Sequence, residues 1–185
     1  MTQPLARHDS DLALLETLRS RLRGLRYDGF GWLQAIYTAP RHGEHVAMTE
    51  ARLIPKVGVE GDRPYKQYWS GKYQPGRQIS AMNAEVLDAL EVGYDTPGDN
   101  LIIRGFDLAS LAAGEALRIG DAILIATGAP HHPCKHFLQR TSTARYAAIR
   151  EGRFRGTLLD TLNEATVRTG DPVERILLPA RYQAR

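Results

Sequence analysis

The sequence predicts a mainly β protein with some α-helix, closed into a β-barrel that carries peripheral helices and an N-terminal helix. The first observation is that most apolar segments are short and lie between Gly, Pro and Asp turns, which is typical of strands. The second is that few segments have helical spacing. Closure into a barrel would leave such strands without exposed edges. The predicted strands are residues 30–37, 77–82, 100–104, 115–119, 122–127 and 173–178, with a hairpin turn at Gly120-Asp121.

Three helices are predicted from capping residues and leucine spacing. Asp9-Ser10-Asp11 precede a stripe of leucines at helical spacing, so we expect the first helix to begin there and to pack this stripe on the main domain. Asn83 is predicted to cap a helix over residues 84–92, and Thr141 or Ser142 to cap one over residues 143–152. We expect residues 1–27 to form an N-terminal helical extension and residues 28–180 to form one domain.

Composition excludes several classes of protein. The chain has 185 residues, 43% of them hydrophobic and 24% charged, which are ordinary values for a soluble globular protein. No apolar run approaches the length of a membrane span, and the N-terminus lacks an apolar signal region. A single cysteine cannot form an internal disulfide, so we expect a cytoplasmic protein. The net charge of +3 does not by itself indicate a nucleic-acid partner.

The segment GAPHHPCKHF, residues 128–137, holds the only cysteine of the chain. Cys134 is surrounded by His131, His132 and His136, and Lys135 follows it directly. A cation and imidazoles beside a thiol favour the thiolate, which is the form that attacks substrates and binds metals. In an extended segment His132, Cys134 and His136 would share one face, while His131 and Lys135 would share the other.

Several functions are compatible with this cysteine segment. Cys134 could be a nucleophile with a histidine base, a ligand of zinc, a ligand of a softer metal such as molybdenum, or a buried and inert thiol. Three zinc ligands so close along one strand would make a poor tetrahedron. The apolar strand before the segment would deliver the thiol to the mouth of the barrel.

A basic region precedes these strands. Between residues 52 and 77, six Lys or Arg stand against two acids, as expected of a pocket for a phosphorylated ligand or of a solvated loop. Asp62 could orient Arg63 toward an anion through a charge-assisted bond, or the two could form a plain ion pair. Further candidates are Arg77 and Gln78 at one predicted strand start, Asn100 at another, and Lys56, a cation of the basic region.

Taken in order, these segments resemble the MOSC domain, the module named for the C-terminus of molybdenum cofactor sulfurases. The resemblance covers about residues 29–178, and its order, spacing and terminal Pro-Cys make it specific. The matching runs are VGVEGDR (57–63), GRQIS (76–80), NAEVLDAL (83–90), DNLIIRGFDLASL (99–111), GEALRIGDAILIATGAPHHPC (114–134) and TVRTGDPV (166–173). Two differences are the triplet Asn163-Glu164-Ala165, where the family has a Gly-Gly pair, and the two histidines before Pro-Cys.

The resemblance implies a β-barrel-like fold and a molybdenum cofactor, Mo-molybdopterin, with Cys134 as the protein ligand to Mo. It implies that basic groups hold the pterin phosphate, and Arg63, Arg77, Lys56 and Lys135 are the candidates, with Gln78 and Asn100 at the mouth and Asp62 beside Arg63. Stand-alone bacterial members resemble reductases that remove oxygen from N-hydroxylated compounds, including hydroxylated purine bases. These draw electrons from a separate protein.

We therefore expect an oxidoreductase with a small-molecule substrate, an electron-donor protein, and no membrane or nucleic-acid partner. His131, His132 or His136 would relay protons. The alternatives are a sulfur carrier with a persulfide on Cys134, a cofactor-handling protein without turnover, and a binding module with a structural cysteine.

Overall fold

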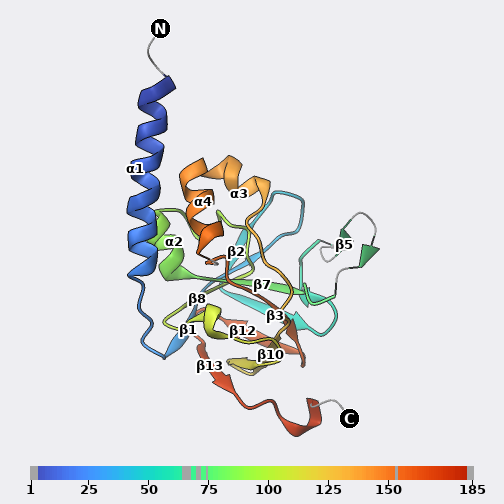
Figure 1. Ribbon diagram of the computed structural model, residues 1–185. Helices are drawn as coiled ribbons and strands as arrows, with labels where there is room; N and C mark the ends of the chain where they lie inside the picture. The colour runs from blue at the N-terminus through green and yellow to red at the C-terminus, as the bar shows by residue number, and fades with distance from the viewer. Residues whose placement is uncertain (1–3, 64–67, 70–71, 74, 153, 183–185) are drawn as a thin grey trace.

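The central feature of the computed structural model is a closed barrel of mixed strands (Figure 1). The structure describes residues 4–63, 68–69, 72–73, 75–152 and 154–182; Pro64 and Lys66 of the basic region lie outside these residues. Neighbouring strands follow the order β13-β9-β10-β11-β7-β8-β1-β2. An additional pairing of β1 with β13, which sets Gly31 opposite Val173, closes seven of these strands into the barrel.

The predicted strands are present, with ends that differ by one or two residues. They are β1 (Gly31–Thr38), β7 (Ile79–Asn83), β8 (Leu101–Arg104), β9 (Ala116–Ile119), β10 (Ala122–Ala126) and β13 (Pro172–Ile176). The sequence did not predict the short strands β2 (Val46–Met48), β3 (Glu50–Ile54), β4 (Gly58–Val59), β5 (Tyr68–Trp69) and β6 (Lys72–Tyr73). The remaining strands are β11 (Thr157–Thr161) and β12 (Ala165–Arg168). β12, β3 and β4 make a second sheet, and β5 and β6 a third.

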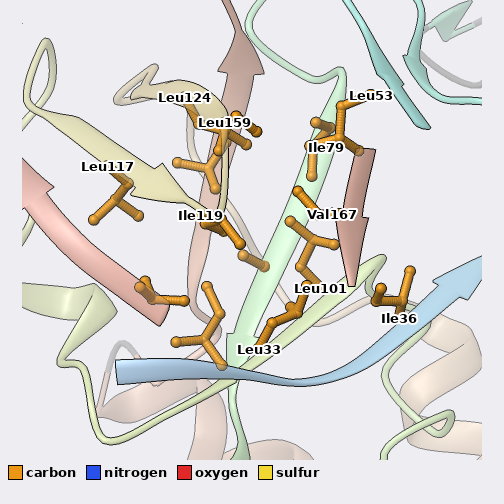
Figure 2. Packing of buried hydrophobic residues seen from close by; sticks show 14 of the residues in the cluster. Leu33, Ile36, Leu53, Ile79, Leu101, Leu117, Ile119, Leu124, Leu159 and Val167 are labelled. Atoms are coloured by element: carbon orange, nitrogen blue, oxygen red, sulfur yellow. The ribbon is translucent and has the colours of Figure 1, made fainter. Parts of the chain in front are cut away.

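The barrel interior is filled by aliphatic side chains from every wall (Figure 2). Leu33, Ile79, Leu101, Leu117 and Leu159 are each fully buried and come from five different strands. Burying side chains of this size gives about 1.5–3 kcal/mol each. The apolar face of every barrel strand is therefore turned inward.

A second apolar cluster lies between the barrel and the helices. β7 and β8 run parallel and are joined by α2 (Ala84–Leu90), so they need a crossover that covers one face of the sheet. β8 is apolar on both faces for this reason: Leu101 and Ile103 enter the barrel, while Ile102 joins the helical cluster. Phe137 of α3 (Lys135–Arg140) is fully buried in the same cluster.

The N-terminal helix packs on this outer cluster through its predicted leucines. Leu18 and Leu22 of α1 (Pro4–Arg23) are buried against α2 and α4 (Thr143–Glu151), whereas Leu12 is 49% exposed. The predicted start at Asp9-Ser10-Asp11 is wrong, because the helix already begins at Pro4. Proline suits this position because the first turn of a helix has no intrahelical partner for its N–H groups.

The two other predicted caps had different outcomes. The Ser142 side chain accepts a hydrogen bond from the Arg145 N–H at 3.2 Å and caps α4, as predicted. Asn83 precedes α2 but its side chain makes no cap hydrogen bond. It donates instead to the carbonyls of Ile103 and Phe106 and thus ties α2 to the turn after β8.

Candidate active site at Cys134

Cys134 is an exposed free thiol at the junction of a loop and a short helix. β10 ends at Ala126, and α3 begins at Lys135, directly after the cysteine. The sequence interpretation of an extended strand through this cysteine is wrong, because the helix changes the direction of the chain at Cys134. The alternation that placed His132, Cys134 and His136 on one face therefore ends there. The alternative of a buried, inert cysteine is wrong as well, because Cys134 is exposed.

The start of the cysteine loop is fastened to the turn before β7. The Thr127 hydroxyl donates to the carbonyl of Gly76 at 2.9 Å and accepts from the N–H of Ala129 at 3.3 Å. Next to it, the Arg77 guanidinium donates to the carbonyl of Pro130 at 3.1 Å. A carbonyl is neutral, so this bond fixes the guanidinium in place without cancelling its charge.

The middle of the loop lies beside a buried ion pair. Nε2 of His131 lies 3.5 Å from Oδ1 of Asp99, and Arg155 pairs with Oδ2 of the same carboxylate. The side chain of Asp99 is fully buried and that of Arg155 is 7% exposed. A charge so far from water must be paired, because desolvation costs several kcal/mol for each unpaired ion. Arg155 also donates to the Pro97 carbonyl at 3.1 Å.

Asn100, which follows Asp99 in the chain, bonds to the basic loop that contains Asp62 and Arg63. Its amide donates to Oδ2 of Asp62 at 3.0 Å and to the carbonyl of Tyr37 at 3.1 Å. The other oxygen of Asp62 accepts from the N–H of Ala39 at 2.6 Å. Asp62 thus holds the loop that carries Arg63, and the neighbours Asp99 and Asn100 bring that loop and the cysteine loop to one place.

Gln78 and Lys56 lie on neighbouring segments that a hydrogen bond joins. Gln78 is buried, and its side-chain oxygen accepts from the backbone N–H of Lys56 at 3.2 Å. Gly58 has φ of +98°, and a Cβ there would lie 2.4 Å from the Gln78 carbonyl oxygen, so only glycine fits the turn. The N–H of Gln78 donates to Asp160 at 3.4 Å. Burial raises the pKa of the Asp160 carboxyl, and this hydrogen bond opposes the shift.

The β1–β2 loop lies against the other side of α3. The rings of His42 and His136 meet edge to face, with centroids 5.1 Å apart. Arg140 at the end of α3 donates to the carbonyls of Gly43 at 2.9 Å and Thr96 at 3.3 Å. Nδ1 of His45 lies 3.2 Å from Arg140. This loop is therefore fixed to the helix that follows Cys134.

Contacts link four of the predicted site segments into one region. Arg77 bonds to the loop that carries Cys134, while Asp62 and Asn100 bond to each other next to Asp99. Lys135 and His132 are exposed beside Cys134, and Arg63 is half-buried. Within the described part of the chain, no group of three His, Cys, Asp or Glu residues could hold a metal ion, so the zinc alternative is not supported.

Two residues that fasten the site, Asp99 and Arg155, were missed from the sequence. Asp99 stands directly before Asn100 in PGDN, and its place between turn and strand could have drawn attention to it. Arg155 gave no such signal, because it lies 21 residues after Cys134 among three arginines, at 150, 153 and 155. Its pairing with Asp99 depends on how the chain folds back after α4.

A surface hollow elsewhere on the molecule lacks the groups that make the cysteine region a candidate site. Its volume is about 390 Å³, and it lies beside β9 and β13. The charged groups in it, Arg175 and Glu115, already pair with each other at 3.4 Å. The hollow therefore offers an apolar surface and a satisfied ion pair, without a thiol.

The comparison with family models decides the family. The model of the MOSC domain matches residues 70–174, more than half of the chain. This chain belongs to the MOSC domain family. The match contains the cysteine loop, the Asp99-Asn100 pair, the barrel strands β7 to β11, and β12 of the second sheet. The resemblance stated from the sequence is thereby confirmed, and the MOSC family is associated with molybdenum cofactor binding.

Solved structures confirm the barrel fold. YuaD from Bacillus subtilis superposes with a TM-score of 0.63 at 18% identity, covering 78% of this chain and 94% of that one. YiiM from Escherichia coli gives a TM-score of 0.58 at 19% identity, covering 84% of this chain and 71% of the other. YiiM from Geobacillus stearothermophilus gives 0.58 at 15% identity, with 80% and 75% covered. The comparison with curated proteins found no match. No helix among the described residues is long and apolar enough to cross a membrane.

Proposed function

We propose that this MOSC protein binds the molybdenum cofactor with Cys134 as the ligand to Mo and acts as an oxidoreductase on N-hydroxylated compounds. The observation that carries the proposal is an exposed thiol on a loop that Arg77 holds by a hydrogen bond and whose His131 lies beside a buried ion pair. A thiol on such a loop stays in position because the loop is held, even though the thiol makes no hydrogen bond of its own within the described part of the chain.

The residues present suit this cofactor by their chemistry. A soft thiolate is the protein donor that a soft metal centre prefers. Arg77 keeps its charge while bonded to a carbonyl, and Lys135 and Arg63 stand on the segments next to it. Arginine and lysine are the side chains that bind a phosphate best. Cys134 would hold the metal, and these cations, with Lys56, would hold the phosphate.

The cofactor, when bound, would supply the two-electron chemistry of the reaction. The reaction breaks the N–O bond of an R–NH–OH group: with two electrons and two protons it yields R–NH₂ and water. The electrons come from a separate donor protein. His132, exposed, and His136, against His42, are candidates to pass the protons, together with His131.

Turnover tests this function directly. The cofactor-loaded protein, reduced by dithionite and methyl viologen, should convert an N-hydroxylated purine base to the amine, and Cys134→Ser should not. His132→Ala and His136→Ala, each with unchanged Mo content, should lower the rate if they pass protons. A loaded wild-type protein that leaves N-hydroxylated bases untouched would contradict the assigned reaction.

A sulfur carrier is the second candidate, and the exposure of Cys134 favours it. A persulfide must reach an acceptor, so a carrier needs its thiol at the surface, where Cys134 is. The discriminating measurement is cyanide-releasable sulfur in the freshly purified protein. About one sulfur for each chain, lost in Cys134→Ser and without any Mo, would favour the carrier over the oxidoreductase.

A further inference from the structure

The cations of this protein are paired unevenly over its surface. Some surface arginines away from the cysteine loop meet carboxylates: Arg118 pairs with Glu174 at 2.5 Å, and Arg168 with Glu50 at 3.0 Å. Others, such as the exposed Arg23 and Arg150, have no ion pair among the described residues, and the same holds for several cations around Cys134. Over the residues that the structure describes, neither Arg77, Lys135 nor Arg140 has an ion pair. The positive charge near the thiol is therefore available to an anionic partner.

This charge divides into two groups by position. Arg77 bonds to Pro130, four residues before Cys134, and belongs with the candidate phosphate site. Arg140 stands at the far end of α3, about 9 Å along the helix from Cys134 at the usual rise per residue. Its bonds to the carbonyls of Gly43 and Thr96 hold it at the surface and leave its charge in place.

The exposed side of α3 and the neighbouring loop form one surface, which we call the α3 face. Its members are exposed residues of α3 and of the β1–β2 loop that is bonded to it: Arg41, His42, Lys135, Leu138, Gln139 and Arg140. Leu138 is 39% exposed, and the side chain of Arg41 is 86% exposed. The one acid of that loop, Glu44, lies at the limit of pairing with Arg41, 3.9 Å away.

We propose that the α3 face is the docking surface for the electron-donor protein, and that this donor carries acidic residues around its flavin or iron–sulfur group. Exposed cations beside an exposed leucine on the same short helix are groups that an acidic patch with an apolar part complements. Docking there would bring the donor's redox group within a short distance of Cys134, and the donor would deliver the two electrons that each turnover consumes. The inference rests on the proposed function.

The test uses the cofactor-loaded full chain and a flavodoxin, a small acidic flavin protein, as the probe donor. Arg41→Glu with Gln139→Glu lowers the charge of the α3 face by three units, which cancels its three cations, without touching a residue of the proposed cofactor site. Arg23→Glu with Ser20→Glu makes the same change of charge on exposed positions of α1 and is the matched control. Each variant is first assayed for Mo content and for turnover with dithionite-reduced methyl viologen, which needs no docking.

We expect the α3 double variant to keep the viologen rate and to raise the KM for flavodoxin about tenfold or more, because electrostatic steering changes encounter rates by that order. The wild-type rate with flavodoxin should fall with rising salt, and that of the variant should fall less. Leu138→Ala, which changes no charge, should also raise this KM.

Two outcomes overturn the inference, and they are distinguishable. If the wild type holds no Mo, the proposed function fails and the docking assignment fails with it. If Mo and the viologen rate are normal but the α3 double variant reacts with flavodoxin as the wild type does, or no worse than the α1 control, the docking assignment alone is wrong.

Discussion

At the scale of single residues, Asp99 links the elements of the site. Its carboxylate meets both His131 of the cysteine loop and Arg155 of the segment before β11. Because Asp99 is fully buried, its charge depends on these partners. We infer that the position of the loop and the stability of the barrel wall are coupled through this ion pair.

Replacing Arg155 by methionine tests this coupling. The substitution keeps the length of the side chain but takes the cation from a buried carboxylate, so we expect a loss of about 3–5 kcal/mol in the free energy of unfolding. Arg118→Met removes a half-exposed arginine from its pair with Glu174 and should cost less than about 1 kcal/mol. Denaturant unfolding measures both, and equal losses would contradict the account.

A second residue-scale prediction concerns Asp160, whose pKa is raised by burial. An acid with a raised pKa in the folded state stabilises the fold below its unfolded pKa, and this contribution is lost as pH rises through the folded pKa. Asp160→Asn should therefore raise the thermal midpoint at pH 7, where the wild type carries a partly buried charge. At about pH 3 the two proteins should unfold alike, since both side chains are then neutral. A variant less stable than wild type at pH 7 would show that the carboxylate is favourably held.

At the scale of elements, a glycine turn lets the basic region pack closely against the start of β7. Gly58 lies in the matched VGVEGDR run, where its positive φ and the nearby Gln78 carbonyl leave no room for a side chain. Glycine is therefore required there both by conformation and by contact.

Gly58→Ala should be clearly more destabilising than Gly43→Ala. Both positions have positive φ, +98° and +82°, so both substitutions cost conformational strain, about 1 kcal/mol or more. Only at Gly58 would the new Cβ meet backbone, because nothing lies within 4 Å of one at Gly43. The difference between the two losses in free energy of unfolding measures the contact, and equal losses would contradict it.

Prediction from the sequence worked for elements that local patterns determine. Six strands and the α4 cap follow from alternation, turn residues and a serine before a helix. The break at Cys134 was not predicted, because six residues are too few for a helical period to stand out. The strands β2 to β6 were not predicted either. Three of them, β4, β5 and β6, have only two residues each, which is too short for an alternating pattern to show.

At the scale of the whole molecule, the barrel sheet has an apolar cluster on its inner side and another on its outer side. The barrel interior is one, and the layer between the sheet and the helices is the other. The fold class was predictable from many short strands, and the family from the order of the motifs. The buried pairing of Asp99 with Arg155 was not, because it joins residues 56 positions apart that only the closed barrel brings together.

The packing of α1 in the helical layer predicts how much its leucines contribute to the free energy of unfolding. Leu18→Ala should cost about 2–5 kcal/mol, because the side chain is fully buried against the other helices. Leu12→Ala on the same helix, 49% exposed, should change the free energy of unfolding little. Denaturant unfolding compares them. A small loss at Leu18 would mean that residues 1–27 are a detachable extension of the domain that we expect over residues 28–180.

The most direct test of the central claim is the molybdenum and pterin content of the native protein. The protein and Cys134→Ser would be purified without oxygen from cells that make the cofactor, and Mo, Zn and released pterin would be measured for each chain by mass spectrometry. The account predicts about one Mo and one pterin in the wild type and loss of Mo in the variant, with an unchanged fold. Wild-type protein from such cells that carries neither Mo nor pterin would contradict it.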